Sequence, residues 1–302
     1  MTDGGFSSGD LIADRRFAWG AAAAREGDHA AAAELFEQTL EIAPRFAAAW
    51  FALAEAREAG GAIEAARAAY ARTCELAPDD PFGAGARLAR LDGATPAGHA
   101  PAYVRKLFDD YAPRFDAHLT GALAYRGPEL LRAAVEARGA RRFARALDLG
   151  CGTGLAGLAF ADLADRLEGV DLSPAMIEAA RARGLYARLE AGEIVAFLAA
   201  EAAASADLAL AADVFVYLGD LAPVFSATAR ALAPGGLIAF TTQAIDAGTY
   251  RLLDDLRFGH APDYLRARLE AAGFADIAIE AASTRRDRGV DTPGLVATAV
   301  RA

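Results

Sequence analysis

The stretch ALDLGCGTGLAG, residues 146–157, has the composition of a ligand-binding loop. A short apolar run leads into closely spaced glycines, where a backbone without side chains can approach a ligand closely. Gly152, Gly154 and Gly157 have the spacing of dinucleotide-binding loops, and Asp171 follows 19 residues after Gly152. Taken alone, this spacing predicts a nicotinamide cofactor.

A second glycine pattern overlaps the first. Asp148 precedes Gly150, Gly152 and Gly154 in the sequence LDLGCGTG. A carboxylate just before the loop disfavours a pyrophosphate, which bare amides and a helix N-terminus would otherwise attract. A ligand that carries ammonium and sulfonium groups would not be repelled. The residues of the loop therefore leave two classes of cofactor open.

The loop lies in a part of the chain where short apolar runs alternate with helical segments. Alternation of this kind predicts an α/β fold with a parallel, doubly wound sheet that helices cover on both faces. Ligands of such sheets bind beyond the carboxyl ends of the strands, where the loop after the first strand would lie. The expected strands are residues 145–150, 166–172, 186–192, 207–213 and 237–243.

The front of the chain contains an internal repeat of 34 residues. The shift aligns Gly27 with Gly61, and in each copy apolar residues at helical spacing flank the glycine. Each copy is therefore expected to form an antiparallel helix pair. Residues 81–91 would add a helix that caps the apolar face, and residues 92–102, rich in Gly, Pro and Ala, would form a linker.

Residues of characteristic type recur within the two copies. They are Gly20, Gly27, Ala32, Phe36 and Pro44 in the first copy and Trp50, Ala66, Tyr70 and Pro78 in the second. Through these residues the copies resemble the tetratricopeptide repeat family, from which the second copy departs at Ala54 and Arg57, where Gly and Tyr are favoured. The resemblance implies a concave surface for a protein partner or for self-association; the alternative is a helical appendage that only packs on the rest of the chain.

Residues 103–302 contain a series of motifs in a fixed order. These are LDLGCGTG, GVDLSPAMIEAAR, DLALAADVFVYLGDL and LAPGGLIAF, with LFDDYAPRFDAHL before them and RFGHAPDYLRARLEAAGF after them. In this order and spacing they resemble a class I S-adenosylmethionine-dependent methyltransferase. The resemblance, which extends to bacterial predicted methyltransferases with tetratricopeptide repeats, implies a Rossmann-like, mostly parallel, seven-stranded sheet that ends in an antiparallel pair. An all-α, repeat-containing domain would precede it, with the boundary between residues 1–97 and 98–302.

The resemblance implies S-adenosyl-L-methionine as the cofactor. The glycine loop would line its methionine part, with Asp148 ordering the loop and the carbonyl groups of Gly150 and Ala211 receiving the ammonium group. Asp171 would accept both ribose hydroxyls, because a carboxylate can take two hydrogen bonds, or would only cap the following helix. The full set of expected contacts is Asp148, Gly150, Cys151, Gly152, Gly154, Asp171, Leu172, Met176, Glu193, Ile194, Ala211, Tyr111 and Tyr125.

The outer members of this set have alternative explanations. Met176 would flank the adenine or pack in its own helix. Glu193, with the amide of Ile194, would bind the adenine edge or stand as an exposed acid at a helix start. Tyr111 and Tyr125 would touch the methionine end, from helices that residues 108–125 form over the cofactor, or would pack in the core.

Methyl transfer is an in-line displacement, so alignment of the nucleophile, methyl group and sulfur matters most. A protonated nitrogen or hydroxyl acceptor also needs a base, for which His118, Asp213, Tyr217 and His260 are candidates; for the histidines, surface or packing roles are the alternative. No His and Cys spacing indicates a metal site. The acceptor stays open between a small molecule and a protein, and the alternative function is a repeat scaffold whose second domain binds the cofactor without catalysis.

The composition of the chain restricts its partners and compartment. A hydrophobic content of 54% with 24% charged residues predicts a globular protein. The net charge of −10 is shared by both halves of the chain and makes nucleic acid an unlikely partner. No apolar run of about 18 residues and no signal-peptide pattern occurs, so we expect a cytoplasmic protein without membrane contact. The two cysteines fall in different predicted domains and predict no disulfide.

Overall fold

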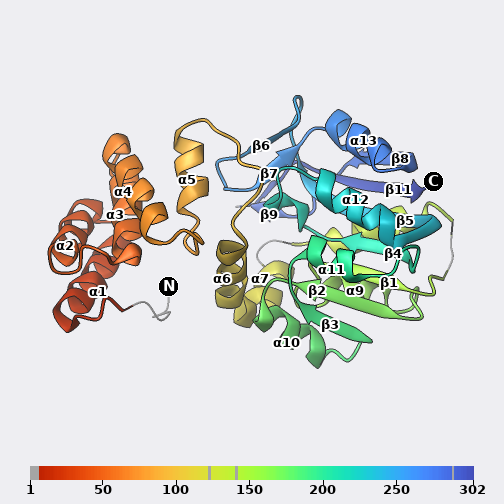
Figure 1. Ribbon diagram of the computed structural model, residues 1–302, viewed down its shortest axis with the longest axis horizontal. Coiled ribbons are helices and arrows are strands. Elements are labelled where there is room, and N and C mark those ends of the chain that lie inside the picture. The colour runs from red at the N-terminus through yellow and green to blue at the C-terminus, as the bar shows by residue number, and fades with distance from the viewer. Residues whose placement is uncertain (1–6, 122–123, 140–141, 288) are drawn as a thin grey trace. The chain divides into compact units, whose positions relative to one another are not determined.

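A computed structural model describes residues 7–121, 124–139, 142–287 and 289–302. The chain divides into two compact units, residues 1–94 and 95–302 (Figure 1). Residues 122–123 of the predicted helical stretch over the cofactor lie outside the described residues. The domain boundary after residue 97 stays a prediction about which part of the chain folds alone.

The first unit consists of helices, as the repeat predicts. Gly27 and Gly61 take φ values of +83° and +80° in the turns between paired helices, a conformation that glycine adopts without strain. A Cβ atom on Gly20 would lie 2.6 Å from Phe36 Cε1, so this glycine lets the ring pack against its helix. The helices are α1 (Leu11–Arg25), α2 (His29–Ile42), α3 (Ala47–Ala59), α4 (Ile63–Leu76) and α5 (Ala84–Leu91).

The second unit is built on a mixed sheet with the strand order β3-β2-β1-β4-β5-β11-β8. Neighbours from β3 to β5 are parallel, and β11 is antiparallel to both β5 and β8. The predicted mostly parallel sheet and its antiparallel ending are confirmed, with seven strands in this order in a sheet of nine among the described residues. The strands are β1 (Ala146–Leu149), β2 (Leu167–Asp171), β3 (Arg188–Ala191), β4 (Ala206–Ala211), β5 (Leu232–Ala244), β8 (Phe274–Ala281) and β11 (Gly294–Arg301).

Two further strands are added to the sheet beside the carboxyl end of β5. Strand β7 (Phe258–His260) pairs in parallel with β5, and β6 (Tyr250–Leu252) pairs with β7. A small separate hairpin, β9 (Arg286–Asp287) with β10 (Val290–Asp291), stands between β8 and β11. The sequence did not predict these strands, because two or three residues are too few to show an alternating pattern.

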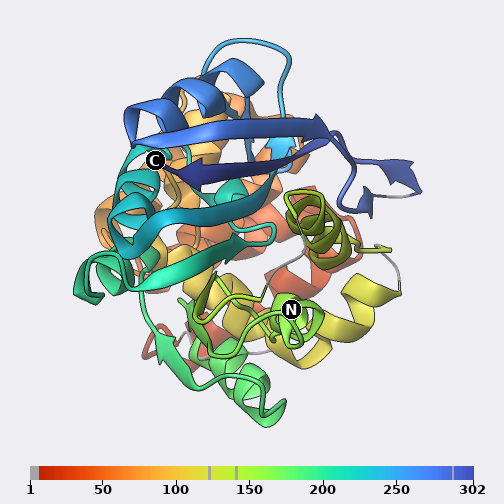
Figure 2. The ribbon, with the colours of Figure 1, turned by 90° about the vertical axis from the view of Figure 1, so that its right-hand side faces the viewer.

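Helices cover both faces of the sheet (Figure 2). Alternate residues of a strand face opposite sides, so Leu208 and Leu210 of β4 pack with α8 (Gly127–Glu136) and α9 (Leu155–Phe160). Ala209 and Ala211 face the other layer. That layer contains α11 (Ile194–Ala200), α12 (Ala222–Ala231) and α13 (Pro262–Ala271), while α10 (Pro174–Ala182) lies against β2 and β3.

The segment predicted as a linker, residues 92–102, is not a free linker over its whole length. The Ala97 carbonyl accepts hydrogen bonds from the amides of Gly219 and Asp220, both at 2.8 Å, and Gly98 forms a bridge with Leu218. Helix α6 (Pro101–Tyr111) then begins inside the predicted linker. The Gly-, Pro- and Ala-rich composition wrongly indicated a free linker, because the Ala97 carbonyl is bonded to amides that lie far along the chain.

Truncation before and after residues 95–97 should show whether this segment is a free linker or stabilises the second unit. A fragment of residues 95–302 is expected to fold, whereas a fragment of residues 98–302 lacks the Ala97 carbonyl and should be less stable by about 1–2 kcal/mol. Urea unfolding of the two fragments measures the difference. Equal stabilities would mean that water replaces the Ala97 carbonyl at no cost, and aggregation of both fragments would show that the repeats share one core with the sheet.

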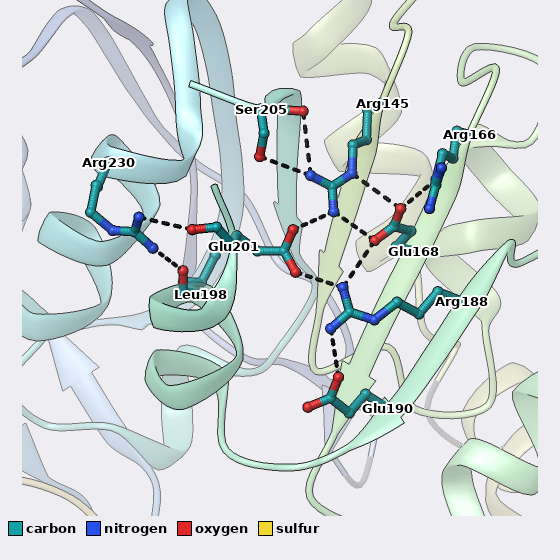
Figure 3. A network of polar contacts seen from close by, with 9 residues as sticks. All are labelled: Arg145, Arg166, Glu168, Arg188, Glu190, Leu198, Glu201, Ser205 and Arg230. Carbon is teal, nitrogen blue, oxygen red and sulfur yellow. Dashed lines mark hydrogen bonds and ion pairs between the residues drawn. The ribbon is translucent and has the colours of Figure 1, made fainter. Parts of the chain in front are cut away.

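An ion network joins the amino ends of the strands (Figure 3). The fully buried carboxylate of Glu168, on β2, accepts two hydrogen bonds from Arg145, at 3.1 and 2.7 Å, and one from Arg166 at 2.5 Å. Glu201 accepts from Arg145 and, at 2.6 Å, from Arg188. The glycine loop lies at the opposite, carboxyl ends of the strands, so this network serves the fold and not the site.

Candidate functional site

The glycine loop follows β1 and turns back on itself through left-handed residues. Gly150, Gly152 and Gly154 have φ values of +74°, +54° and +91°, which side chains rarely allow. A Cβ atom on Gly150 would lie 2.5 Å from Val214 Cγ2. A Cβ atom on Gly152 would meet only Phe115, at 3.9 Å. Of these three glycines, Gly152 is therefore the one beside which the described protein atoms leave room for a ligand.

The later glycines of the loop make room for protein atoms. A Cβ atom on Gly157 would lie 2.2 Å from the Tyr186 hydroxyl, and one on Gly154 would lie 3.0 Å from Arg183 Cδ. Gly157, the third glycine of the dinucleotide pattern, thus accommodates Tyr186. The third glycine of a dinucleotide-binding loop has a similar packing role, so Gly157 does not discriminate between the two cofactor classes.

The amides of the loop are engaged within the protein. Gly150 and Cys151 donate to the Val170 carbonyl at 2.8 and 2.9 Å, and Gly152 donates to Asp171 Oδ2 at 2.9 Å. A pyrophosphate site needs free amides that point at the ligand. These three amides are not available to a pyrophosphate.

Asp171 ends β2 beside the loop. Its Oδ1 accepts from the Ser173 amide at 2.8 Å, while Oδ2 accepts from Gly152, so the carboxylate is fixed against the open bend. Burial raises the pKa of this carboxyl, although both amide hydrogen bonds oppose the shift. Ser173 caps α10 through Met176, so the capping role belongs mainly to Ser173.

Asp148, which precedes the loop, is fully buried. Its Oδ2 accepts from the Tyr186 hydroxyl at 2.7 Å, and among the described residues Oδ1 has no hydrogen-bond partner. Burial raises the pKa of Asp148 to about 7, against the opposing hydrogen bond from Tyr186. Burial also raises the pKa of Cys151, so its thiol is protonated.

Tyr186→Phe should therefore reduce stability in a pH-dependent manner. Since the folded-state pKa of Asp148 is raised to about 7, ionisation of this carboxyl costs stability as the pH rises through 7. The Tyr186 hydroxyl offsets part of this cost, so the variant should lose about 1 kcal/mol above pH 7 and less below it. Denaturant unfolding across this pH range measures the effect, and a loss that is the same on both sides of 7 contradicts the assignment.

Helices α6 and α7 (Phe115–Thr120) supply acids that hold the loop. Asp109 accepts from the Ser173 hydroxyl at 2.6 Å. Asp116 accepts from the Thr153 hydroxyl and from Arg183, both at 2.5 Å. The sequence predicted helices over this site without identifying these acids, although LFDDYAPRFDAHL contains both of them.

A small cavity of about 40 Å³ lies at the loop. It brings together Gly150, Cys151, Gly152 and Tyr125 of the predicted contacts, next to the carboxyl end of β4. Asp171, which holds the Gly152 amide, does not line this cavity. The other lining residues are Phe115, Pro128, Thr153, Leu155, Ala156 and Ala212.

The residues predicted for the adenine side do not line this cavity. Met176 is fully buried in α10, and Ile194 is also buried. Glu193 caps α11 by accepting from the Ala196 amide at 2.8 Å. Their contacts with an adenine remain predictions.

Two further predicted contacts do not line the cavity either. Ala211, predicted to accept from the ammonium group, is fully buried, and Leu172 is half-buried. Their contacts with the cofactor also remain predictions.

Two of the candidate bases differ sharply in surroundings. His118 is exposed, and its Nδ1 hydrogen-bonds to the Tyr111 hydroxyl. His260 is fully buried with Nε2 3.0 Å from the Gly219 carbonyl and Nδ1 2.7 Å from the Thr242 hydroxyl. Burial lowers the pKa of His260 to about 4. With both ring nitrogens engaged, the neutral ring has a packing role and no free position for a substrate proton.

Asp213 and Tyr217 follow β4. Asp213 has a φ of +56° and accepts from the hydroxyls of Thr241 at 2.9 Å and Thr284 at 3.2 Å. Tyr217 is half-buried and packs edge-on against Phe108, with ring centroids 5.3 Å apart. Asp213 is thus held in place by two hydroxyl donors.

Comparison with known proteins agrees with this geometry. Residues 147–238 match the family model of a methyltransferase domain, and residues 23–91 match that of the tetratricopeptide repeat. The ubiquinone biosynthesis O-methyltransferase of Xanthomonas oryzae pv. oryzae is 33% identical over 102 residues, which are 33% of this chain and 43% of that protein. Its Xylella fastidiosa counterpart is 32% identical over 33% of this chain and 42% of its own. The chain thus spans less than half the length of these curated relatives.

Solved structures share the fold of the second unit. The [4+2]-cyclase SpnF has a TM-score of 0.55 at 22% identity, over 68% of this chain and 98% of its own. The Burkholderia thailandensis 1,6-didemethyltoxoflavin-N1-methyltransferase, solved with bound 1,6-didemethyltoxoflavin and S-adenosylhomocysteine, has a TM-score of 0.50 at 20% identity, over 65% of this chain and 87% of its own. These likenesses concern the fold alone.

Within the second unit, residues 147–238 thus match a methyltransferase domain, in a fold that solved methyltransferases share. The match to tetratricopeptide repeats precedes it in the chain, in the order that the sequence predicted. Within the described part of the chain, no helix is long and apolar enough to cross a membrane.

Proposed function

We propose that this protein transfers a methyl group from S-adenosylmethionine to a small-molecule or protein acceptor. The contact between Asp171 and the Gly152 amide, at 2.9 Å, is the observation that carries the proposal. It fixes a carboxylate beside the open bend of the glycine loop, where a ribose could be held while the methionine part enters the cavity.

The charge of the site also favours this cofactor over a nicotinamide nucleotide. Asp109 and Asp171 hold the turn after β2 and the Gly152 amide, whereas Asp116 is paired with Arg183 and Asp148 is buried with a pKa of about 7. A pyrophosphate would meet the carboxylate of Asp171 where the amides of Gly150, Cys151 and Gly152 are engaged. A sulfonium and an ammonium group are attracted by the same carboxylate.

Each residue has a distinct task in the proposed site. Asp171 binds the ribose hydroxyls, the carbonyl groups of Gly150 and Ala211 accept from the ammonium group, and Tyr125 borders the methionine end. When bound, the cofactor supplies a methyl group on a positively charged sulfur. The protein then aligns the acceptor with that methyl group and excludes water from the cavity.

The curated relatives are named O-methyltransferases, which favours an oxygen nucleophile and hence a proton acceptor. We propose His118 for this role, because it is exposed on α7, one of the two helices that hold the loop, and among the described residues only its Nδ1 is engaged. Tyr111 would fix its ring orientation. Asp213 and His260 are held by other partners and serve to position neighbouring groups.

The tetratricopeptide repeats are proposed to bind a protein, either the acceptor itself or a partner that brings the acceptor. Their family match supports a protein-binding role. The identity of that partner and the cytoplasmic compartment stay predictions.

Calorimetry tests the cofactor directly. S-adenosylmethionine and S-adenosylhomocysteine are expected to bind the full-length protein with one site each, and NADH is expected not to bind. Incubation with methyl-labelled S-adenosylmethionine and separated small-molecule and protein fractions of the host then shows which fraction is labelled. Binding of NADH without binding of S-adenosylhomocysteine would reject the proposed function.

A further inference from the structure

Asp116 connects helix α7 to the glycine loop. Its Oδ1 accepts from the Thr153 hydroxyl and its Oδ2 from Arg183, both at 2.5 Å. Arg183 also donates to the Thr153 carbonyl at 2.5 Å, so each of the three residues is bonded to the other two. Thr153 lies within the loop and lines the cavity. The position of α7 is therefore tied directly to the loop.

Helix α6 is held independently of this contact. Near its end, Asp109 accepts from the Ser173 hydroxyl at 2.6 Å and from the Ala175 amide at 3.3 Å. Just before its start, the His99 amide donates to the Tyr217 carbonyl at 3.1 Å. Because both ends of α6 have partners of their own, a movement of α7 would leave α6 in place.

The chain between the two helices is a short 3₁₀ turn, η1 (Ala112–Arg114). Its Pro113 has no amide hydrogen to donate, and Arg114, which precedes α7, makes no side-chain cap bond. A 3₁₀ stretch between α-helical segments often marks a hinge. This turn therefore gives α7 a point about which it can pivot.

Helix α7 also closes the cavity at the loop. Its first residue, Phe115, lines the cavity, and the ring atom Cε1 lies 3.9 Å from the place of a Cβ atom on Gly152. The cavity holds about 40 Å³, close to the volume of one water molecule, whereas sites for small molecules span about 300 Å³ or more. S-adenosylmethionine therefore needs Phe115 to move before it can enter.

The contact that holds α7 is accessible to water. The side chains of Asp116 and Arg183 are 45% and 25% exposed. Water and salt compete for the charges of such a pair. The pair can therefore separate without leaving an uncompensated charge buried in the protein.

We propose that α7 is a flap that pivots at η1 to admit S-adenosylmethionine, and that Asp116 is the positioning residue that holds the flap closed. The inference rests on the proposed function and adds how the cofactor enters the site. Closure also sets the position of His118, the proposed proton acceptor, because His118 lies on the same helix.

The kinetics of S-adenosylhomocysteine binding test the role of Asp116. Surface plasmon resonance on captured full-length protein gives the association and dissociation rate constants separately. Asp116→Ala should raise both about tenfold and leave Kd within about threefold, because the flap is held in the free and the bound protein alike. Asp116→Asn keeps an acceptor for the Thr153 hydroxyl without the charge, so it should raise both constants by less. A residue that only orders the cofactor site would raise the dissociation rate constant alone and weaken binding.

Asp110→Ala is the matched control. Asp110 lies on α6, pairs with Lys106 at 3.0 Å and is 59% exposed, so its replacement removes the same charge while the contacts of Asp116 stay in place. Its rate constants should equal those of the unaltered protein. Unchanged rate constants in Asp116→Ala, a rise in dissociation alone, or an equal rise in Asp110→Ala overturns the role of Asp116. If the unaltered protein binds no S-adenosylhomocysteine, the proposed function is rejected and the flap with it.

Discussion

Replacing Arg145 by methionine is expected to lower the free energy of unfolding of the methyltransferase unit by about 3–5 kcal/mol. The guanidinium bonds to the fully buried Glu168, to Glu201 and to Ser205 (Figure 3). Methionine keeps much of the length of the side chain but none of these bonds. The buried carboxylates of Glu168 and Glu201 would then keep only Arg166 and Arg188 as ion-pair partners.

The same substitution should change the pH dependence of stability. Burial by itself would raise the pKa values of Glu168 and Glu201, but the hydrogen bonds and charges of their arginines outweigh it and lower both below 4.5. A lowered folded-state pKa contributes stability that is present above the unfolded value and lost as the pH falls through the folded one. The difference between wild type and Arg145→Met should therefore be largest near neutral pH and shrink as the pH falls below 4.5.

Arg166→Met is the matched control for this experiment. Arg166 also bonds to Glu168, but its side chain is 59% exposed, so its loss should cost less than about 1 kcal/mol. Chemical denaturation of the three proteins at several pH values compares them. If both methionine variants lose the same stability, the network is not organised around Arg145.

Asp171→Ala is expected to weaken the binding of S-adenosylhomocysteine by about 1.5–3 kcal/mol, or roughly 10- to 150-fold. Alanine removes the acceptor of the ribose hydroxyls and also frees the Gly152 amide that the carboxylate now holds. Calorimetric titration of the full-length protein measures the change. Asp171→Asn should fall between the wild type and the alanine variant, because one neutral acceptor oxygen remains.

Loss of local order could imitate this effect, so a variant that disturbs only the turn is needed. Ser173→Ala removes the cap of α10 and the hydroxyl that donates to Asp109, but leaves Asp171 in place. It should lose about 1 kcal/mol of stability and keep its affinity for S-adenosylhomocysteine. An unchanged affinity in Asp171→Ala, or an equal loss in Ser173→Ala, would remove Asp171 from the proposed cofactor site.

The amino-acid sequence by itself determined the helix pairs of the repeats, the alternating strands and helices, and the class of the second unit. Each of these depends on patterns that are local in the chain. The 34-residue shift, the apolar runs of β1 and β4 and the glycines after β1 are all visible within a few tens of residues. The sequence also held two cofactor classes open at the loop, and the engaged amides of Gly150, Cys151 and Gly152 favour the sulfonium cofactor.

Only the tertiary structure decided which side chains meet. Asp109 and Ser173 are 64 residues apart, Asp116 and Thr153 are 37 apart, and the carbonyl of Ala97 finds its amides beyond residue 218. The packing role of His260 and the short strands after β5 have the same origin. Such contacts depend on how strands order themselves in the sheet and how helices close over it. No local pattern encodes that order, since each residue type is compatible with many partners until the fold selects one.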